Sequence, residues 1–214
     1  MATPRVEIVA RELAYQGYFK IIRLRLRHEL FAGGMSPVIT RELFERGQAA
    51  AVLPYDPVRD EVVLVEQFRV GALDAPGEPW LLEPIAGIIE DDEAAAEVAR
   101  REALEEANLE ISDLIDACEY FVSPGGATER CRVFVGRVDT AGAGGVFGLP
   151  DEGEDIKVHV LGLDAALGLI RERRLRVAST LVALQWLALN RSMVRARFLA
   201  QDPRAPLEPG TGAG

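Results

Sequence analysis

The chain has little that would suit a secreted or membrane-spanning protein. Its 214 residues include only two cysteines, Cys118 and Cys131, which are isolated and fit neither a disulfide framework nor a cysteine metal site. No run of about 18 or more apolar residues occurs, and the N-terminus has no apolar core of signal-peptide length. A soluble protein of the reducing cytoplasm is therefore expected.

Positive charge is also scarce. Lysine and arginine number 24 against 34 aspartates and glutamates, which gives a formal net charge of -10 and a pI near 4.8. Nucleic acids and anionic membranes are bound through basic patches, so neither is an expected partner. Arg23, Arg25 and Arg27 alternate with leucines, which indicates a solvated sheet face or, alternatively, a phosphate-attracting one. A small anionic substrate would need bound metal ions.

The most informative segment is residues 87–109, GIIEDDEAAAEVARREALEEANL, in which a glycine turn precedes a helix with three glutamates near its end. At about 3.6 residues per turn, Glu102, Glu105 and Glu106 share roughly a quarter of the helix surface. They repel one another, but three hard oxygen donors facing one point are what a magnesium ion requires. Similar glutamate runs occur on many solvated helix faces, so the spacing of the surrounding residues decides between the two interpretations.

That spacing fits the pattern Gx5Ex7REUxEExGU, where U is apolar. The matching residues are Gly87, Glu93, Arg101, Glu102, Ala103, Glu105, Glu106 and Leu109. Asn108 replaces a glycine of the pattern, and asparagine is the next choice for the left-handed residue that ends a helix. The segment resembles the Nudix box of hydrolases that cleave a nucleoside diphosphate linked to another moiety. Asp91 or Asp92 is the expected cap at the start of the helix.

The chain is expected to have three parts: an N-terminal antiparallel sheet over residues 1–48, a hydrolase domain over residues 49–200, and a flexible tail over residues 201–214 rich in proline and glycine. Two or three isolated strands are marginal in water, so the N-terminal sheet should pack on the main body or on a second copy, which favours a homodimer. Two helices near the C-terminus are expected to be capped by Asp164 and by Ser179 or Thr180.

The likeness extends beyond the glutamate helix and is specific to one branch of the family. The segments that resemble the ADP-ribose pyrophosphatases are RELFERGQAA (41–50), EQFRVGALD (66–74), PWLLEPIAGIIE (79–90), SPGGATE (123–129) and DEGEDIKVHV (151–160). The similarity covers residues 5–192. It implies an α/β fold, a Nudix-type alpha/beta/alpha sandwich with a mixed sheet, and the strand and helix pattern of the chain agrees with it.

Carried onto this sequence, the resemblance implies a site for two or three magnesium ions, which manganese can replace. The expected metal ligands are the carbonyl of Ala86 and the carboxylates of Glu102, Glu106 and Glu154, with Glu105 as a helper. Glu152 is expected to be the general base or to position the attacking water. Arg101 is expected to hold a glutamate of the cluster in place, and an ordinary surface ion pair is the alternative.

The same resemblance assigns four side chains to the substrate. Arg69 would hold the diphosphate and Glu129 the terminal ribose, while Tyr18 and Arg41 would contact adenine from the N-terminal sheet of the partner subunit. Two alternatives stay open, because Arg69 can be a plain strand-face charge and Tyr18 a core residue beside Phe19.

The expected reaction is magnesium-dependent hydrolysis of ADP-ribose to AMP and ribose 5-phosphate, through attack of an activated water on phosphorus. One alternative is a hydrolase of another nucleoside diphosphate sugar. A second, from a different class, is a module that senses ADP-ribose without cleaving it. The intact glutamates disfavour the sensor, and the SPGG segment favours ADP-ribose over a nucleotide sugar.

Overall fold

A computed structural model of the protein describes residues 4–149 and 153–205, which form two compact units. One unit comprises the chain up to Gln48 together with Tyr120–Cys131, and the other comprises Ala49–Glu119 and the chain from Arg132 onward. Glu152, the expected base, and residues 206–214 of the expected tail lie outside the described residues. No helix in the described part of the chain is long and apolar enough to cross a membrane.

The N-terminal unit contains the expected small antiparallel sheet. Its strands, in spatial order, are β1 (Val6–Gln16), β2 (Lys20–His28) and β3 (Ile39–Glu45). Because side chains alternate across a strand, the arginines of β2 share one face. On that face Arg23 donates to Glu42 at 3.3 Å and Arg27 donates to Glu7 at 2.8 Å. These ion pairs support the solvated-face interpretation, since both guanidiniums already have carboxylate partners.

Residues 120–131 belong to the same unit because they pair with the end of β3. The amide of Phe44 donates to the carbonyl of Gly126 at 2.7 Å, and the amide of Thr128 donates back to the carbonyl of Phe44 at 3.1 Å. Phe44 and Ala127 form a parallel bridge. The SPGG segment, which the sequence marks mainly as a turn, is therefore fixed to the N-terminal sheet.

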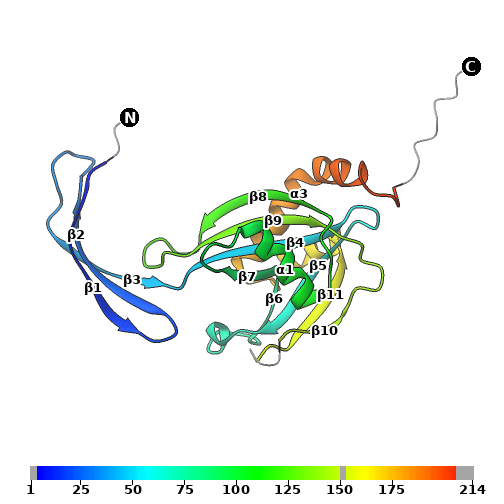
Figure 1. The fold of residues 1–214 in the computed structure, drawn as a ribbon, viewed down its shortest axis with the longest axis horizontal. Helices are drawn as coiled ribbons and strands as arrows, with labels where there is room; N and C mark the ends of the chain where they lie inside the picture. The colour runs from blue at the N-terminus through cyan, green and yellow to red at the C-terminus, as the bar shows by residue number, and fades with distance from the viewer. Residues whose placement is uncertain (1–3, 150–152, 206–214) are drawn as a thin grey trace, which may run out of the picture. The chain divides into compact units, whose positions relative to one another are not determined.

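The second unit is built on a mixed sheet of eight strands. Six of them run in the spatial order β10-β11-β5-β4-β9-β8, while β6 pairs with β5 and β7 pairs with β4 (Figure 1). The strands are β4 (Gln48–Asp56), β5 (Glu61–Phe68), β6 (Trp80–Glu83), β7 (Ile85–Ile89), β8 (Asp113–Phe121), β9 (Arg130–Arg137), β10 (Gly145–Phe147) and β11 (Ile156–Gly162).

Helices cover both faces of this sheet, as an alpha/beta/alpha sandwich requires (Figure 1). They are α1 (Ala95–Ala107), α2 (Leu163–Arg171) and α3 (Ala178–Leu199), with a short 3-10 turn η1 (Val70–Ala72) after β5. In β5, Val63 and Val65 join a core cluster with α1. On the other side, the ring of Tyr55 lies 6.4 Å from that of Phe198 on α3. The predicted fold class is confirmed.

The predicted caps of the two C-terminal helices are wrong. Gly162 precedes α2, so Asp164 lies in its first turn, and Val177 precedes α3, so Ser179 and Thr180 lie inside that helix. Neither helix has a side-chain cap hydrogen bond. The hydroxyl of Thr180 is instead used between elements, since it donates to the carbonyl of Leu82 at 2.9 Å. Tertiary contacts thus claim the polar side chain that the sequence suggested for capping.

The first residues of the expected tail are held by ion pairs. Asp202 is buried, and Arg204 donates to Asp202 at 2.7 Å and to Asp56 at 3.0 Å. Asp56 ends β4 and is fully buried. These contacts connect the end of the described chain to the middle of the main sheet.

Candidate active site

Helix α1 begins and ends where its sequence allows, although its start differs from the prediction. Ala94 is the residue before the first turn, and no side chain caps it, so the predicted cap by Asp91 or Asp92 is wrong. At the other end, Asn108 adopts the left-handed conformation with φ 50° and ψ 42°, as predicted. The amide of Leu109 donates to the carbonyl of Ala103 at 2.9 Å, which closes the last turn.

Small residues let α1 lie close to β7. The buried face of α1 consists of Val98, Ala99, Ala103, Glu106 and Ala107. Gly87 on β7 faces Glu102, and a Cβ atom added at Gly87 would overlap the Glu102 carboxylate. The glycine of the motif therefore permits the close approach of strand and helix that brings Glu102 beside β7.

Glu106 is the most deeply buried of the motif carboxylates, with 3% of its surface exposed. Its Oε2 atom is buried and has no hydrogen-bond partner, while the backbone of Ala86 hydrogen bonds to the carboxylate. Burial, together with the charges of Glu102 and Glu154, raises the pKa of Glu106 to about 8. Burial likewise raises the pKa of Glu102. These carboxylates repel one another in a place where little water can separate their charges.

The cluster has the chemistry of a site for a hard divalent cation. Carboxylate and carbonyl oxygens are the ligands that magnesium prefers, and a cation would satisfy the unpaired oxygen of Glu106 and reverse the repulsion. Among the described residues, no three histidine, cysteine, aspartate or glutamate side chains are gathered closely enough to hold an ion as they stand. The ligand set of Ala86, Glu102, Glu106 and Glu154 therefore remains a prediction, one that the donor chemistry fits.

Arg101 organises the outer side of the cluster. Its guanidinium donates to Glu93 at 3.1 Å, to Glu102 at 2.8 Å and to Glu105 at 3.1 Å. All three acceptors are glutamates of the motif. Because one guanidinium joins three carboxylates, Arg101 limits the orientations available to Glu102 and Glu105, which is more than an isolated surface ion pair would do.

Arg69 interacts electrostatically with Glu106 and Glu154 of the same cluster. Its guanidinium binds both oxygens of Glu83, with donor–acceptor distances of 2.7 to 3.1 Å. Burial alone would lower the pKa of Arg69, but the carboxylate of Glu83, followed by those of Glu106 and Glu154, raises it. A cation this close to the carboxylates could contact an anionic substrate bound there. An ordinary charge on a strand face would not have three carboxylates acting on it, so this environment favours the substrate-binding interpretation over the alternative.

Glu154 enters the site from the loop between β10 and β11. Its carboxylate accepts a hydrogen bond from the amide of Leu149 at 3.0 Å, and its amide donates to the carbonyl of Leu149 at 3.3 Å. A Cβ at Gly148 would meet the side chain of Glu154, so this glycine leaves room for it. Glu154 is close enough for its charge to raise the pKa of both Glu102 and Glu106. Glu152 falls outside the described residues.

The remaining predicted substrate residues lie in the N-terminal unit. Tyr18 is 87% exposed, so it is not the core residue that was the alternative, and its ring stacks edge-on with Phe19 at 4.7 Å. Arg41 is exposed on β3 and donates to the carbonyl of Thr40. Glu129 is buried and pairs with Arg46 at 3.3 Å. Within this unit all three side chains stand on or beside the small sheet.

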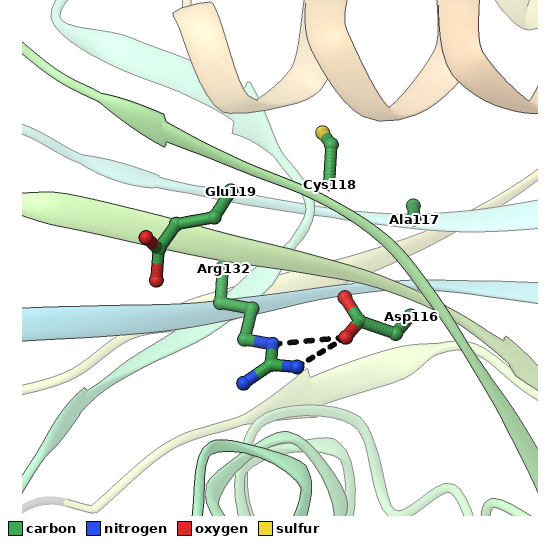
Figure 2. A pocket seen from close by; sticks show the side chains of 5 residues that line it. All are labelled: Asp116, Ala117, Cys118, Glu119 and Arg132. Carbon is green, nitrogen blue, oxygen red and sulfur yellow. Dashed lines mark hydrogen bonds and ion pairs between the residues drawn. The ribbon is translucent and has the colours of Figure 1, made fainter. Parts of the chain in front are cut away.

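A separate open pocket of about 510 Å³ lies along β8 and β9. It is lined by Asp116, Ala117, Cys118, Glu119 and Arg132. Figure 2 shows the Asp116 carboxylate turned toward the Arg132 guanidinium, while Cys118 points away from this pair. Burial raises the pKa of the Cys118 thiol, and Asp116 adds to the shift, so the thiol is a poor nucleophile near neutral pH. None of the predicted site residues lines this pocket.

Two charged residues that pair with predicted site residues were missed by sequence reasoning. Glu83 lies in the matched segment PWLLEPIAGIIE, but a single glutamate in a strand gives no sign of its partner. Arg46 lies in the matched segment RELFERGQAA, and its guanidinium sits 5.6 Å from the ring of Phe19 as well as beside Glu129. Both partners are distant in sequence, so only the fold reveals these pairs.

Comparison with known proteins relates the chain to one family of domains. A family model described as the NUDIX domain matches residues 45–181. The ADP-ribose pyrophosphatase of Escherichia coli (strain K12) is 48% identical over 190 residues, which cover 89% of this chain and 91% of that protein. The ADP-ribose pyrophosphatase of Haemophilus influenzae is 45% identical over 188 residues, covering 86% and 87% respectively.

More distant comparisons widen the range of substrates among similar proteins. The GDP-mannose pyrophosphatase of Cronobacter sakazakii is 36% identical over 155 residues, which cover 70% of this chain and 78% of that protein. A solved structure titled "Crystal structure of ADP compounds hydrolase" superposes with a TM-score of 0.68 at 20% identity. It covers 91% of this chain and 98% of its own, so the two proteins share their fold.

Proposed function

The chain belongs to the NUDIX domain family and is a Nudix hydrolase, and from this premise we propose that it hydrolyses the diphosphate of ADP-ribose to AMP and ribose 5-phosphate. The observation that carries the proposal is the 48% identity to an ADP-ribose pyrophosphatase over 89% of the chain. The match also spans 91% of that enzyme and, at 190 residues, is longer than the region that the family model matches.

Divalent metal dependence follows from the family, and we propose magnesium, with manganese as a substitute, bound as two or three ions by Ala86, Glu102, Glu106 and Glu154. The chemistry that bound magnesium supplies is positive charge on the diphosphate and a lower pKa for an attacking water. The unpaired buried oxygen of Glu106 supports this assignment. Arg101 would keep Glu102 and the helper Glu105 turned toward the site.

The reaction also needs a proton acceptor and groups that hold the substrate. We propose Glu152 as the residue that takes the proton from water or orients it, and Arg69 as a donor to a phosphate oxygen that stabilises charge during in-line attack. Glu129 would accept hydrogen bonds from the terminal ribose, and Tyr18 and Arg41 would contact adenine. The exposed ring of Tyr18 is free to stack on a base.

We also propose a homodimer, in which the small N-terminal sheet takes part in dimerisation and substrate contact. On β1, the side chains of Val6, Ile8, Leu13 and Tyr15 are all more than half exposed. A sheet of three strands with so much exposed apolar surface is poorly stable by itself, and a second copy could cover that surface. A cytoplasmic location is consistent with the free thiol of Cys118.

Two alternatives to ADP-ribose hydrolysis are a different substrate class and a function without catalysis. Identity of 36% to a GDP-mannose pyrophosphatase favours a nucleotide sugar as the second candidate substrate class. A sensor without catalysis is disfavoured because the motif glutamates are intact and Arg101 pairs with three of them.

The test is incubation of the purified protein with ADP-ribose, GDP-mannose and ADP-glucose, each with magnesium and each with excess chelator, followed by chromatographic detection of the nucleotide released. We expect AMP and ribose 5-phosphate from ADP-ribose, in the magnesium samples alone. Faster release of GMP from GDP-mannose would move the assignment to nucleotide sugars, and binding of ADP-ribose without any product would indicate a sensor.

A further inference from the structure

Glu83 and Arg69 form a two-point ion pair beside the acidic cluster. Nε of Arg69 donates to both oxygens of Glu83, at 3.1 and 2.9 Å, and Nη2 donates to Oε2 at 2.7 Å. Such fork geometry fixes the plane of a guanidinium as well as its position. The Glu83 side chain is 9% exposed and that of Arg69 is 45% exposed. The buried carboxylate thus holds the Nε and Nη2 edge of the guanidinium and leaves the edge with Nη1, called the outer edge, open.

The outer edge of Arg69 has donors to spare. In the described part of the chain, the guanidinium of Arg69 donates through Nε and Nη2 only, which leaves the two N–H groups of Nη1 unused. The backbone at Arg69 is also fixed. Its amide donates to the carbonyl of Pro79 at 2.8 Å, which extends the pairing of β5 with β6. Arg69 therefore offers unused hydrogen-bond donors from a rigid base.

The Glu83–Arg69 pair lies near the predicted metal ligands in both sequence and space. Glu83 ends β6, and Ala86 follows three positions later near the start of β7, so the pair ties Arg69 to the strand that directly precedes the expected carbonyl ligand. Glu106 and Glu154 also attract Arg69. Without Glu83, the guanidinium would be drawn onto those two carboxylates and would compete with a cation for them.

A buried negative charge next to an anion-binding arginine weakens the attraction of that arginine for phosphate. The charge alone is therefore a disadvantage in a diphosphate site, and the gain must come from orientation. We propose that Glu83 is a positioning residue that holds one edge of Arg69, so that the other edge faces the substrate diphosphate and the guanidinium stays off Glu106 and Glu154. This inference rests on the proposed function.

The proposal is tested with Glu83→Gln, which keeps the shape of the side chain but removes its charge and one acceptor, in the presence and absence of Arg69. The four proteins are the wild type, Glu83→Gln, Arg69→Ala and the double variant. Glu66→Gln is the matched control, because Glu66 lies on β5, faces the other side of the sheet and pairs with His159 at 2.8 Å. Thermal unfolding of each protein checks that it is folded.

Two quantities are measured: KM and kcat for ADP-ribose with magnesium, and the affinity of the substrate-free protein for Mn²⁺ by electron paramagnetic resonance. We expect Glu83→Gln to raise KM about tenfold and to weaken Mn²⁺ binding about tenfold, the scale of a lost supporting contact. In the Arg69→Ala background the same substitution should change both by less than about twofold. Glu66→Gln should match the wild type.

Equal effects of Glu83→Gln with and without Arg69, or no effect in either background, would overturn the proposal. If Glu83→Gln does not fold, Glu83→Asp replaces it, since it keeps the charge but cannot reach Arg69 with both oxygens, and the same dependence on Arg69 is expected. A wild type that does not cleave ADP-ribose would defeat the proposed function instead. The Mn²⁺ measurement would then still decide whether Glu83 keeps Arg69 off the acidic cluster.

Discussion

A carboxylate buried as deeply as Glu106 destabilises a protein unless a partner satisfies it. Glu106 has one oxygen without a hydrogen bond and two further carboxylates near it, so the fold alone gains nothing from its charge. A hydrophobic residue would pack better at this position of α1. The unfavourable arrangement is understandable if the charge serves ligand binding, because functional sites commonly carry strained or unsatisfied groups.

Removal of the charge should therefore abolish function without harming the fold. We expect Glu106→Gln and Glu102→Gln each to lower turnover of ADP-ribose by at least about a hundredfold, measured by steady-state AMP release. In metal-free buffer the melting temperature of Glu106→Gln should not fall, since a neutral amide relieves the repulsion. Glu97→Gln, on the exposed side of the same helix, is the control and should retain activity. Near-normal turnover by either site variant would contradict the assignment.

At the residue scale, the sequence predicted those groups whose spacing follows one helix. Glu102, Glu105 and Glu106 share a face because of the helical repeat alone, and the structure brings Arg101 to Glu102 and Glu105. Glu83 could not be predicted in this way, because its partner Arg69 is reached only through the pairing of β5 with β6. Sequence patterns specify local neighbours well, whereas partners across a sheet depend on register.

Among whole elements, the C-terminal end of α1 shows how a departure from the motif is accommodated. Asn108 has a positive φ of 50°, a conformation that glycine adopts freely and asparagine tolerates better than other residues with a Cβ. This conformation lets the chain turn away from α1 toward β8 while the amides of Asn108 and Leu109 still bond the last turn. Asparagine thus fulfils the conformational role of the motif glycine.

Substitutions at this position should separate conformation from side-chain identity. Asn108→Gly should leave the free energy of unfolding nearly unchanged, because glycine adopts the left-handed conformation without strain. Asn108→Ala should lower it by about 1 kcal/mol, the cost of placing an ordinary side chain in that conformation. Urea unfolding followed by circular dichroism measures both values. Equal stabilities of the glycine and alanine variants would show that the conformation is not what matters here.

The starts of helices were less predictable than this end. Asp91, Asp92, Asp164, Ser179 and Thr180 are all good capping residues, yet α1, α2 and α3 begin without a side-chain cap. In the structure, Asp164 accepts a hydrogen bond from Arg191 and Thr180 donates to Leu82. Polar side chains near a helix start can serve either the helix or its neighbours, and the sequence alone does not distinguish these uses.

Across the whole molecule, the fully buried Asp56 joins distant parts of the hydrolase unit. It accepts hydrogen bonds from Arg59 at 2.7 Å, from the amide of Thr140 at 3.1 Å and from Arg204 at 3.0 Å. These partners come from the β4–β5 turn, the segment that follows β9 and the C-terminal segment. Burial alone would raise the pKa of Asp56, but these hydrogen bonds hold it well below its usual value.

This depressed pKa links stability to pH. A carboxyl whose pKa is lower in the folded than in the unfolded chain stabilises the fold above its unfolded pKa, about 3.9, and loses that contribution as the pH falls further. We expect the contribution of Asp56 to the free energy of unfolding to be steady from pH 7 to about 5 and to be lost progressively below about pH 4, as measured by urea titration. Asp56→Asn should be less stable at pH 7 by about 3 kcal/mol.

The same variant supplies the control for this prediction. Because Asp56→Asn has no carboxyl at this position, its stability should decline less on acidification than that of the wild type. Identical acid profiles for the two proteins would show that other groups account for the pH dependence. Asp60 and Asp113 also have lowered pKa values, since bonds from Arg191 and Arg197 outweigh the effect of burial, so part of the decline should remain.

The overall architecture was predictable because the family resemblance covers nearly the whole described chain, and the layered fold agrees with it. The position of residues 120–131 was not, because a turn motif gives no information about which strand it will pair with. The bridge between Phe44 and Ala127 assigns this segment, and Glu129 with it, to the N-terminal unit. Long-range pairing of this kind depends on the arrangement of the complete sheet.

The proposed hydrolysis requires that the carboxylates beside α1 hold divalent cations around a bound diphosphate. The direct measurement is a titration of Mn²⁺ into wild type and Glu106→Gln, with a non-hydrolysable ADP-ribose analogue present, followed by electron paramagnetic resonance of the free ion. We expect specific, saturable uptake of Mn²⁺ by the wild type and an affinity for Mn²⁺ at least about tenfold weaker in Glu106→Gln. Absence of uptake by the wild type, or equal uptake by both proteins, would contradict the proposal.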